Sequence, residues 1–188
     1  MSADQQPDRK MAVTDERLLH EGHSYTFVDL TVKYPDDKVR NKPIVRHQGA
    51  ATILPLLETD DADHKIVMVR NERVTIDRYL LELPAGGIDK DEEPIEAAAR
   101  ELIEETGYRA QRIEPLCQFL TTPGLTDELM HVFVARDLEH VGQRLEPYES
   151  LSVELHEPGR VLDMVHSNEI TDAKTMLTIL TAKTKGLI

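Results

Sequence analysis

The sequence of 188 residues contains a single cysteine, Cys117, and no tryptophan. One cysteine cannot form a disulfide within the chain or supply the thiolate cluster of a structural zinc site. A disulfide-stapled fold and a cysteine-rich zinc module are therefore excluded. Scarce cysteine is typical of a reducing compartment, so we expect the protein to be cytoplasmic.

Positive charge is also scarce. Lysine and arginine number 22 against 35 aspartates and glutamates, which leaves a formal net charge of −13. This charge repels nucleic-acid phosphates, and no local basic run offsets it, so we expect no nucleic-acid partner. A small phosphorylated ligand remains compatible with the charge if a divalent cation and a few arginines act locally.

Long apolar runs are absent as well. No segment approaches the length of about 20 apolar residues that a membrane-spanning helix needs. Residues 1–10 lack the apolar centre of a signal peptide, and residues 1–12 have the composition of a loose tail. We therefore expect no membrane partner and no export. With 40% hydrophobic residues the chain can still form a folded domain with a small appended part.

Alternation and short apolar runs predict that the chain is mainly strand. The predicted strands cover 24–33, 43–47, 50–57, 66–69, 79–83, 115–120, 130–135 and 152–155. Spacings of three and four predict helices over 91–106, 159–166 and 172–184. Strands with a few inserted helices indicate an α+β fold, an α/β/α sandwich around a mixed sheet.

The helix predicted over 91–106 ends in crowded negative charge. Its apolar stripe is formed by Ile95, Ala98, Ala99 and Leu102. Glu101, Glu104 and Glu105 follow, and each like-charge pair four residues apart costs about 0.2 to 0.5 kcal/mol. The run on its own is typical of a solvated acidic face. Alternatively, a hard cation such as Mg²⁺ compensates the repulsion, because clustered oxygen ligands suit it.

The residues around this cluster resemble a complete Nudix box. From Gly86 the chain has five residues, Glu92, seven residues and then RELIEETGY over 100–108. The pattern G-x5-E-x7-R-E-U-x-E-E-x-G-U, with U aliphatic, is matched everywhere except at Tyr108. The chain is therefore similar to the Nudix hydrolases, which use metal ions to cut a nucleoside diphosphate linked to another group.

The resemblance implies a loop–helix–loop in which Glu101, Glu104 and Glu105 bind Mg²⁺, with Mn²⁺ as an alternative. Glu101 and Glu105 are thereby predicted to be catalytic, because bound ions polarise phosphoryl oxygens and acidify water. The box residues with implied structural roles are Gly86, Glu92, Arg100 and Gly107. Arg100 precedes Glu104 by four residues and can also offset the carboxylate repulsion.

The resemblance extends to the ADP-ribose pyrophosphatase group of the family. Residues 80–89 (LLELPAGGID) are similar to that group's L-E-x-P-A-G segment, which implies that the carbonyl of Ala85 joins the metal shell. Residues 46–50 resemble its E-H-x-G-A segment, residues 71–73 its Q-x-R segment, and residues 169–175 its G-E-I-x-D-A-K-T segment. The similarity thus covers most of the chain after its N-terminal quarter.

Arginines are the predicted ligands of the substrate diphosphate. Arg73 comes first and Arg46 second, because a planar guanidinium can bind two oxygens at once. Either could instead be a surface ion-pair partner. Without tryptophan, stacking on an adenine falls to Tyr25 or Phe27, although rings in an alternating strand more often belong to a core.

The group resemblance places the general base on a late loop outside the box. The matching region is 145–153 (LEPYESLSV), in which Glu149 is the predicted base and Glu146 the second candidate. An exposed loop carboxylate without function is the alternative.

The resemblance to the ADP-ribose pyrophosphatase group implies a Mg²⁺-dependent enzyme that hydrolyses ADP-ribose to AMP and ribose 5-phosphate, and it also implies a homodimer, as that group tends to form. Residues 1–45 are expected to form a tail and antiparallel strands for dimerisation or substrate contacts, and residues 46–188 the Nudix domain. One alternative substrate is another nucleoside diphosphate sugar, such as a UDP- or GDP-linked hexose. The other alternative is a catalytically silent Nudix module that binds a nucleotide.

Overall fold

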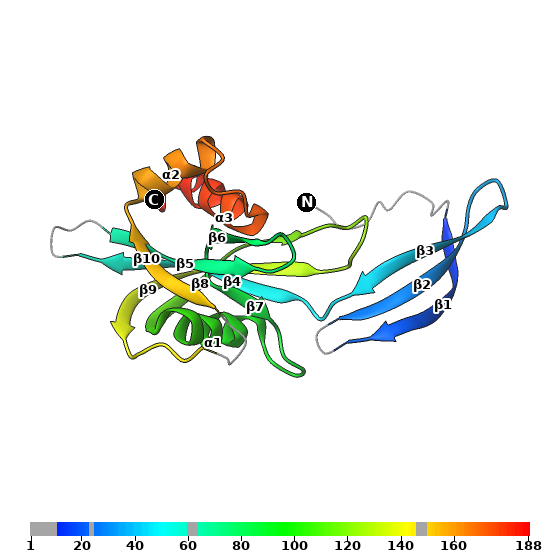
Figure 1. The fold of residues 1–188 in the computed structure, drawn as a ribbon, viewed down its shortest axis with the longest axis horizontal. Helices are drawn as coiled ribbons and strands as arrows, with labels where there is room; N and C mark the ends of the chain where they lie inside the picture. Colours follow the sequence, from blue (N-terminus) through cyan, green and yellow to red (C-terminus); the bar gives the residue numbers. More distant parts are fainter. Residues whose placement is uncertain (1–10, 23–24, 60–63, 146–149) are drawn as a thin grey trace. The chain divides into compact units, whose positions relative to one another are not determined.

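A computed structural model describes residues 11–22, 25–59, 64–145 and 150–188 (Figure 1). The chain folds into two compact units. One comprises Met1–His47 and Thr122–Glu128, and the other comprises Gln48–Thr121 and Leu129–Ile188. Within the described residues, no helix has both the length and the apolar character needed to cross a membrane.

The first unit is built on a three-stranded antiparallel sheet. Its strands, in sheet order, are β1 (Ala12–Glu21), β2 (Thr26–Lys33) and β3 (Val39–Arg46). The middle strand buries Val28, Leu30 and Val32 on one face, as its period-two alternation predicts. The segment Thr122–Glu128 joins this unit through Val45, whose N–H donates to the Leu125 carbonyl at 2.9 Å.

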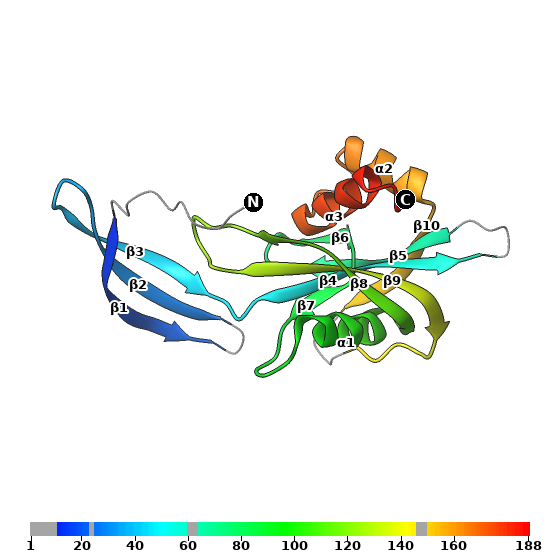
Figure 2. The same ribbon diagram turned by 180° about the vertical axis from the view of Figure 1, so that it is seen from behind.

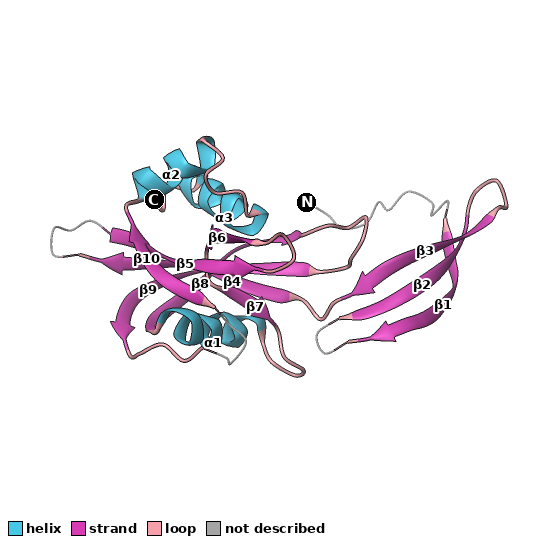
Figure 3. Cartoon of the chain, viewed as in Figure 1, coloured by secondary structure: helices cyan, strands magenta, loops and turns pink. Residues whose placement is uncertain are grey.

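The second unit contains a mixed sheet with helices on both faces (Figures 1 and 2). The strand order is β10 (Leu151–His156), β5 (His64–Arg73), β4 (Ala50–Glu58), β9 (Leu129–His140) and β8 (Tyr108–Leu120), with β6 (Arg78–Glu82) beside β5 and β7 (Ala85–Gly87) beside β4. Only the β4–β9 pair is parallel among these described strands. The helices are α1 (Pro94–Thr106), α2 (Pro158–His166) and α3 (Ala173–Thr184) (Figure 3). The α+β sandwich with additional N-terminal antiparallel strands is thus confirmed.

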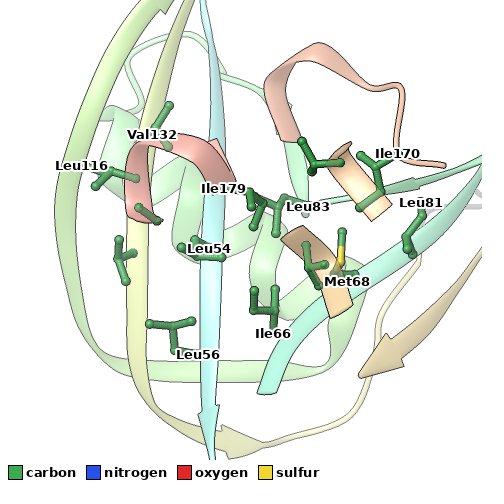
Figure 4. Close-up of a cluster of buried hydrophobic side chains, with 14 of the residues drawn as sticks. Leu54, Leu56, Ile66, Met68, Leu81, Leu83, Leu116, Val132, Ile170 and Ile179 are labelled. Atoms are coloured by element: carbon green, nitrogen blue, oxygen red, sulfur yellow. The ribbon is translucent and has the colours of Figure 1, made fainter. Parts of the chain in front are cut away.

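Strand β4 organises the core of the second unit because it is buried on both faces. Ala51 and Ile53 point to the face that α1 covers, where they pack with Leu102. Leu54 and Leu56 point to the opposite face, which α2 and α3 cover (Figure 4). A strand that is covered twice has an almost continuous apolar sequence, which is why its bounds were predicted closely.

Helix α1 departs from its prediction in two ways. It begins at Pro94 rather than residue 91, because Glu93 and Glu96 form a capping box around its first turn. The predicted apolar stripe is wrong at Ile95, which is 41% exposed, whereas Ala97 is fully buried. The buried face is rotated because it also contains Glu101 and Glu105.

Candidate active site

Helix α1 directs two buried carboxylates at strand β7. Glu101 and Glu105 are only 7% and 4% exposed, although both are charged residues. Oε2 of Glu105 accepts a hydrogen bond from the Ala85 N–H at 3.0 Å. A Cβ on Gly86 would lie 2.0 Å from Oε1 of Glu101, so only glycine leaves room for that carboxylate. The two glutamates therefore meet consecutive residues of one short strand.

Arg100 pairs with three carboxylates, of which two are on the helix and one, Glu92, precedes it. Its Nε and Nη2 donate to the two carboxylate oxygens of Glu92 at 2.9 and 3.0 Å. Its Nη1 donates to Glu101 at 2.6 Å and to Glu104 at 3.1 Å. The hydrogen bond from Arg100 is the main reason that the pKa of Glu92 lies below its usual range. Three carboxylates thus share one guanidinium, and negative charge remains in excess.

This arrangement bears on the predicted metal ligands. In the described part of the chain, no three His, Cys, Asp or Glu side chains gather into a group that could hold a metal ion. Glu101 and Glu104 are instead hydrogen-bonded to Arg100. Their oxygen chemistry suits a hard divalent cation, which would compete with Nη1 for these two side chains.

The C-terminal end of α1 is held by the segment 141–144. Gly107 adopts a left-handed conformation (φ 74°), and its carbonyl accepts the N–H of Val141 at 2.7 Å. The Arg144 N–H donates to the Glu104 carbonyl at 3.0 Å, and Nε2 of Gln143 donates to the Glu105 carbonyl at 2.6 Å. These bonds satisfy carbonyls that a helix end leaves without partners, and they fix the backbone of Glu104 and Glu105.

A pocket of about 260 Å³ lies beside this helix. Its lining residues are Asn71, Glu72, Arg73, Val74, Ala85, Glu105 and Ser150. The structure therefore brings together Arg73, Ala85 and Glu105, which the sequence had singled out in three separate segments. Asn71, Glu72, Val74 and Ser150 were not identified as site residues. The Q-x-R resemblance over 71–73 was a signal for Asn71, whereas no local pattern indicated Ser150.

Three predicted substrate residues, Arg46, Tyr25 and Phe27, belong to the first unit. Arg46 donates to Glu16 at 2.5 Å and to Asp127 at 2.8 Å, and these bonds raise its pKa above the usual value. The Tyr25 ring lies 5.1 Å from that of His47, and the Phe27 ring lies 6.2 Å from that of His20. Their roles in binding substrate stay predictions.

The candidate bases Glu149 and Glu146 lie outside the described residues. Ser150, the next residue along the chain, lines the pocket, and its carbonyl accepts the N–H of Glu72 at 3.1 Å. The residue that directly follows the predicted base Glu149 in the sequence therefore lines the pocket.

The NUDIX domain family matches residues 46–177. The chain belongs to the Nudix family. A relative described as an ADP-ribose pyrophosphatase, from Bacillus subtilis, is 40% identical over 150 residues, which are 79% of each chain. A GDP-mannose pyrophosphatase from Cronobacter sakazakii is 34% identical over 174 residues, covering 85% of this chain and 86% of the relative. A solved structure of an ADP compounds hydrolase shares the fold, with a TM-score of 0.82 at 20% identity over 98% of this chain and 100% of that one.

The one departure from the Nudix box has a packing explanation. Tyr108 stands where the pattern has an aliphatic residue, and its ring packs edge-on against His140 with the centroids 5.2 Å apart. The side chain also packs against the apolar cluster under α1. The tyrosine thus retains the packing role of this Nudix position, and its ring contacts the end of β9.

Proposed function

We propose that this Nudix protein hydrolyses ADP-ribose to AMP and ribose 5-phosphate. The observation that carries the proposal is that a guanidinium and a box carboxylate, Arg73 and Glu105, line one pocket. Hydrolysis of a diphosphate needs positive charge at the phosphate oxygens and an activated water at the phosphorus. Arg73 would supply the positive charge, and Glu105 would help to hold the ion that activates the water. The similarity to an ADP-ribose pyrophosphatase over most of the chain supports this substrate.

Mg²⁺ is the proposed cofactor, with Mn²⁺ as an alternative. The residues that would hold it are the carbonyl of Ala85 and the carboxylates of Glu101, Glu104 and Glu105. Two observations support the fit of a divalent cation to these residues: Gly86 leaves space for the Glu101 carboxylate, and carboxylates are in excess around Arg100. When bound, the ion would polarise phosphoryl oxygens and lower the pKa of the attacking water.

The side chains of the protein have three proposed tasks. Arg73 binds the diphosphate oxygens through N–H donors that its own ion pair leaves available. Glu105 presents its carboxylate to the pocket while it accepts the Ala85 N–H. Glu149 takes the proton from the water, with Glu146 as the second candidate, and the position of Ser150 in the pocket wall supports this choice. A homodimer and a cytoplasmic location stay predictions from the sequence.

Product analysis over a panel of substrates tests the proposal. The protein is incubated with Mg²⁺ and ADP-ribose, GDP-mannose or a UDP-hexose, and the nucleoside monophosphates are quantified by chromatography. We expect AMP to form fastest. Faster release of GMP would favour a GDP-sugar as substrate, which the similarity to the GDP-mannose pyrophosphatase makes the second candidate. Binding without any cleavage would instead support a silent nucleotide-binding module.

A further inference from the structure

Arg73 belongs to a network of charged side chains centred on Glu82. Glu82 is 1% exposed, although it carries a carboxylate. Nε of Arg73 donates to its Oε1 at 2.8 Å, and Nη2 of Arg73 donates to its Oε2 at 2.6 Å. The ammonium of Lys174 also donates to Oε2 of Glu82 and pairs with Asp172 at 3.0 Å. One buried carboxylate thus holds two cations.

The start of helix α3 supplies the second cation. Asp172 caps the helix by accepting the N–H of Thr175 at 3.0 Å and its hydroxyl at 2.6 Å. The hydroxyl oxygen of Thr175 accepts the N–H of Leu83 at 2.9 Å. The helix start is therefore fastened to the consecutive residues Glu82 and Leu83, 92 residues earlier in the chain. This fastening places Lys174, which is 11% exposed at its side chain, against Glu82.

The network restricts what Arg73 can offer to a ligand. A guanidinium has five N–H donors in a rigid plane. The pair with Glu82 uses the single N–H of Nε and one of the two N–H groups of Nη2. The terminal edge, formed by Nη1 and the second donor of Nη2, is left for an anion. The same pair raises the pKa of Arg73 and cancels its charge locally. Lys174 is a second cation on Glu82, so the negative charge of Glu82 is shared between two cations, while Lys174 also pairs with Asp172.

We propose that Lys174 is a positioning residue for diphosphate binding, and that it acts through Glu82 to orient Arg73 and to keep its charge available to the substrate. This inference rests on the proposed function, because it gives Lys174 of the D-A-K-T segment a role in binding the same substrate. Lys174 does not line that pocket, so its effect on a ligand would pass through Glu82 and Arg73.

The binding of a methylene-bridged ADP-ribose analogue, measured by calorimetry with Mg²⁺, tests this role without requiring turnover. We expect Lys174→Met to raise the dissociation constant about tenfold, because an oriented charge-assisted contact weakens. Lys174→Arg should restore binding to within about threefold, since it keeps the charge and a donor. In hydrolysis assays KM should rise more than kcat falls. Lys174→Gln, which keeps a donor without charge, serves where Lys174→Met does not fold.

Glu154→Gln is the matched control. Glu154 forms a similar pair with Arg70, three residues before Arg73 on β5, and neither residue lines the pocket. This variant should bind the analogue as the unaltered protein does, even where its thermal stability falls. Unchanged binding by Lys174→Met and Lys174→Gln, or equal weakening by Glu154→Gln, would overturn the proposal. An unaltered protein that does not bind the analogue would overturn the proposed function itself, which is a separate result.

Discussion

Two networks of charged side chains in the second unit differ in the group that their members share. Around Arg100, the carboxylates of Glu92, Glu101 and Glu104 share one guanidinium. Around Glu82, one carboxylate is shared by Arg73 and Lys174. In the first network three carboxylates depend on one guanidinium, a deficit of positive charge that a divalent cation would fill. In the second network Lys174 also pairs with Asp172, so the charges balance and one edge of the Arg73 guanidinium is left for a phosphate.

The pocket lies where these two kinds of chemistry meet. Glu105 comes from the helix of the Arg100 network, and Arg73 comes from the Glu82 network. The acidic partners of Arg100 lie within eight positions of it in the chain, whereas Glu82 and Lys174 are 92 positions apart. The comparison shows that the acidic and the basic side chain of the pocket are held in different ways, Glu105 by a local arrangement on α1 and Arg73 by a long-range network that fastens α3 to the sheet.

Replacing Glu105 with glutamine should have the largest effect on activity. The amide oxygen can still accept the Ala85 N–H, so the fold should persist, but the negative charge is lost. We expect ADP-ribose turnover to fall about a thousandfold, the scale for losing one preorganised electrostatic group. Steady-state assays measure the loss, and thermal unfolding serves as the control. A variant that turns over at the parent rate would exclude the proposed role.

Gly86→Ala should have the next largest effect. Its Cβ would lie 2.0 Å from Oε1 of Glu101, so the carboxylate must move away. We expect activity to fall about tenfold to a hundredfold, with less than about 2 kcal/mol lost in unfolding free energy, because the displaced group is a flexible side-chain end. Gly87→Ala is the matched control, since nothing lies within 4 Å of its Cβ. Equal effects of the two changes would contradict this reading.

Arg100→Met tests whether the carboxylates around Arg100 repel one another. It removes the cation that Glu92, Glu101 and Glu104 share, and we expect a loss of about 1 to 3 kcal/mol in unfolding free energy. Added Mg²⁺ should recover more stability in this variant than in the unaltered protein, because repulsion between the carboxylates is then larger. Thermal unfolding with and without Mg²⁺ checks this. An identical response of both proteins would show that the carboxylates do not attract the ion.

The smallest expected effect concerns acid stability. The hydrogen bond from Arg100 lowers the pKa of Glu92 in the folded protein, so this interaction stabilises the fold above the unfolded-state pKa and is lost as pH falls through the lowered value. Glu92→Gln should therefore be less stable at pH 7, by less than about 1 kcal/mol, and should lose less stability on acidification below about pH 5. Unfolding temperatures across that range measure it, and parallel curves would contradict it.

The sequence predicted best what depends on local patterns. The Nudix box, its helix and the doubly covered strand β4 follow from spacing and apolar runs within single segments. Strand β1 was missed because all ten of its residues are exposed and its charges interrupt the alternation. The polar first half of β8 was missed for the same reason, since it lies at the edge of the sheet.

The candidate site was predicted only where its residues lie in recognisable segments. Arg73, Ala85 and Glu105 were named from the sequence, yet the partners of Arg73 were not. Glu82 and Lys174 lie in segments that resemble the ADP-ribose pyrophosphatase group, but the resemblance does not say which side chains meet. The contact between Glu82 and Lys174 joins residues 92 positions apart, which only the packing of α3 on the sheet brings together. Side-chain partners across such distances leave no periodic signal.

Manganese binding tests the central claim most directly, because it asks whether the carboxylates of α1 hold a divalent cation. Free Mn²⁺ is followed by electron paramagnetic resonance while the unaltered protein and a Glu101→Gln, Glu105→Gln double variant are titrated. We expect the unaltered protein to bind Mn²⁺ saturably, so that the free-ion signal falls, and we expect the folded double variant to leave the signal unchanged. Equal Mn²⁺ binding by both proteins would contradict the claim.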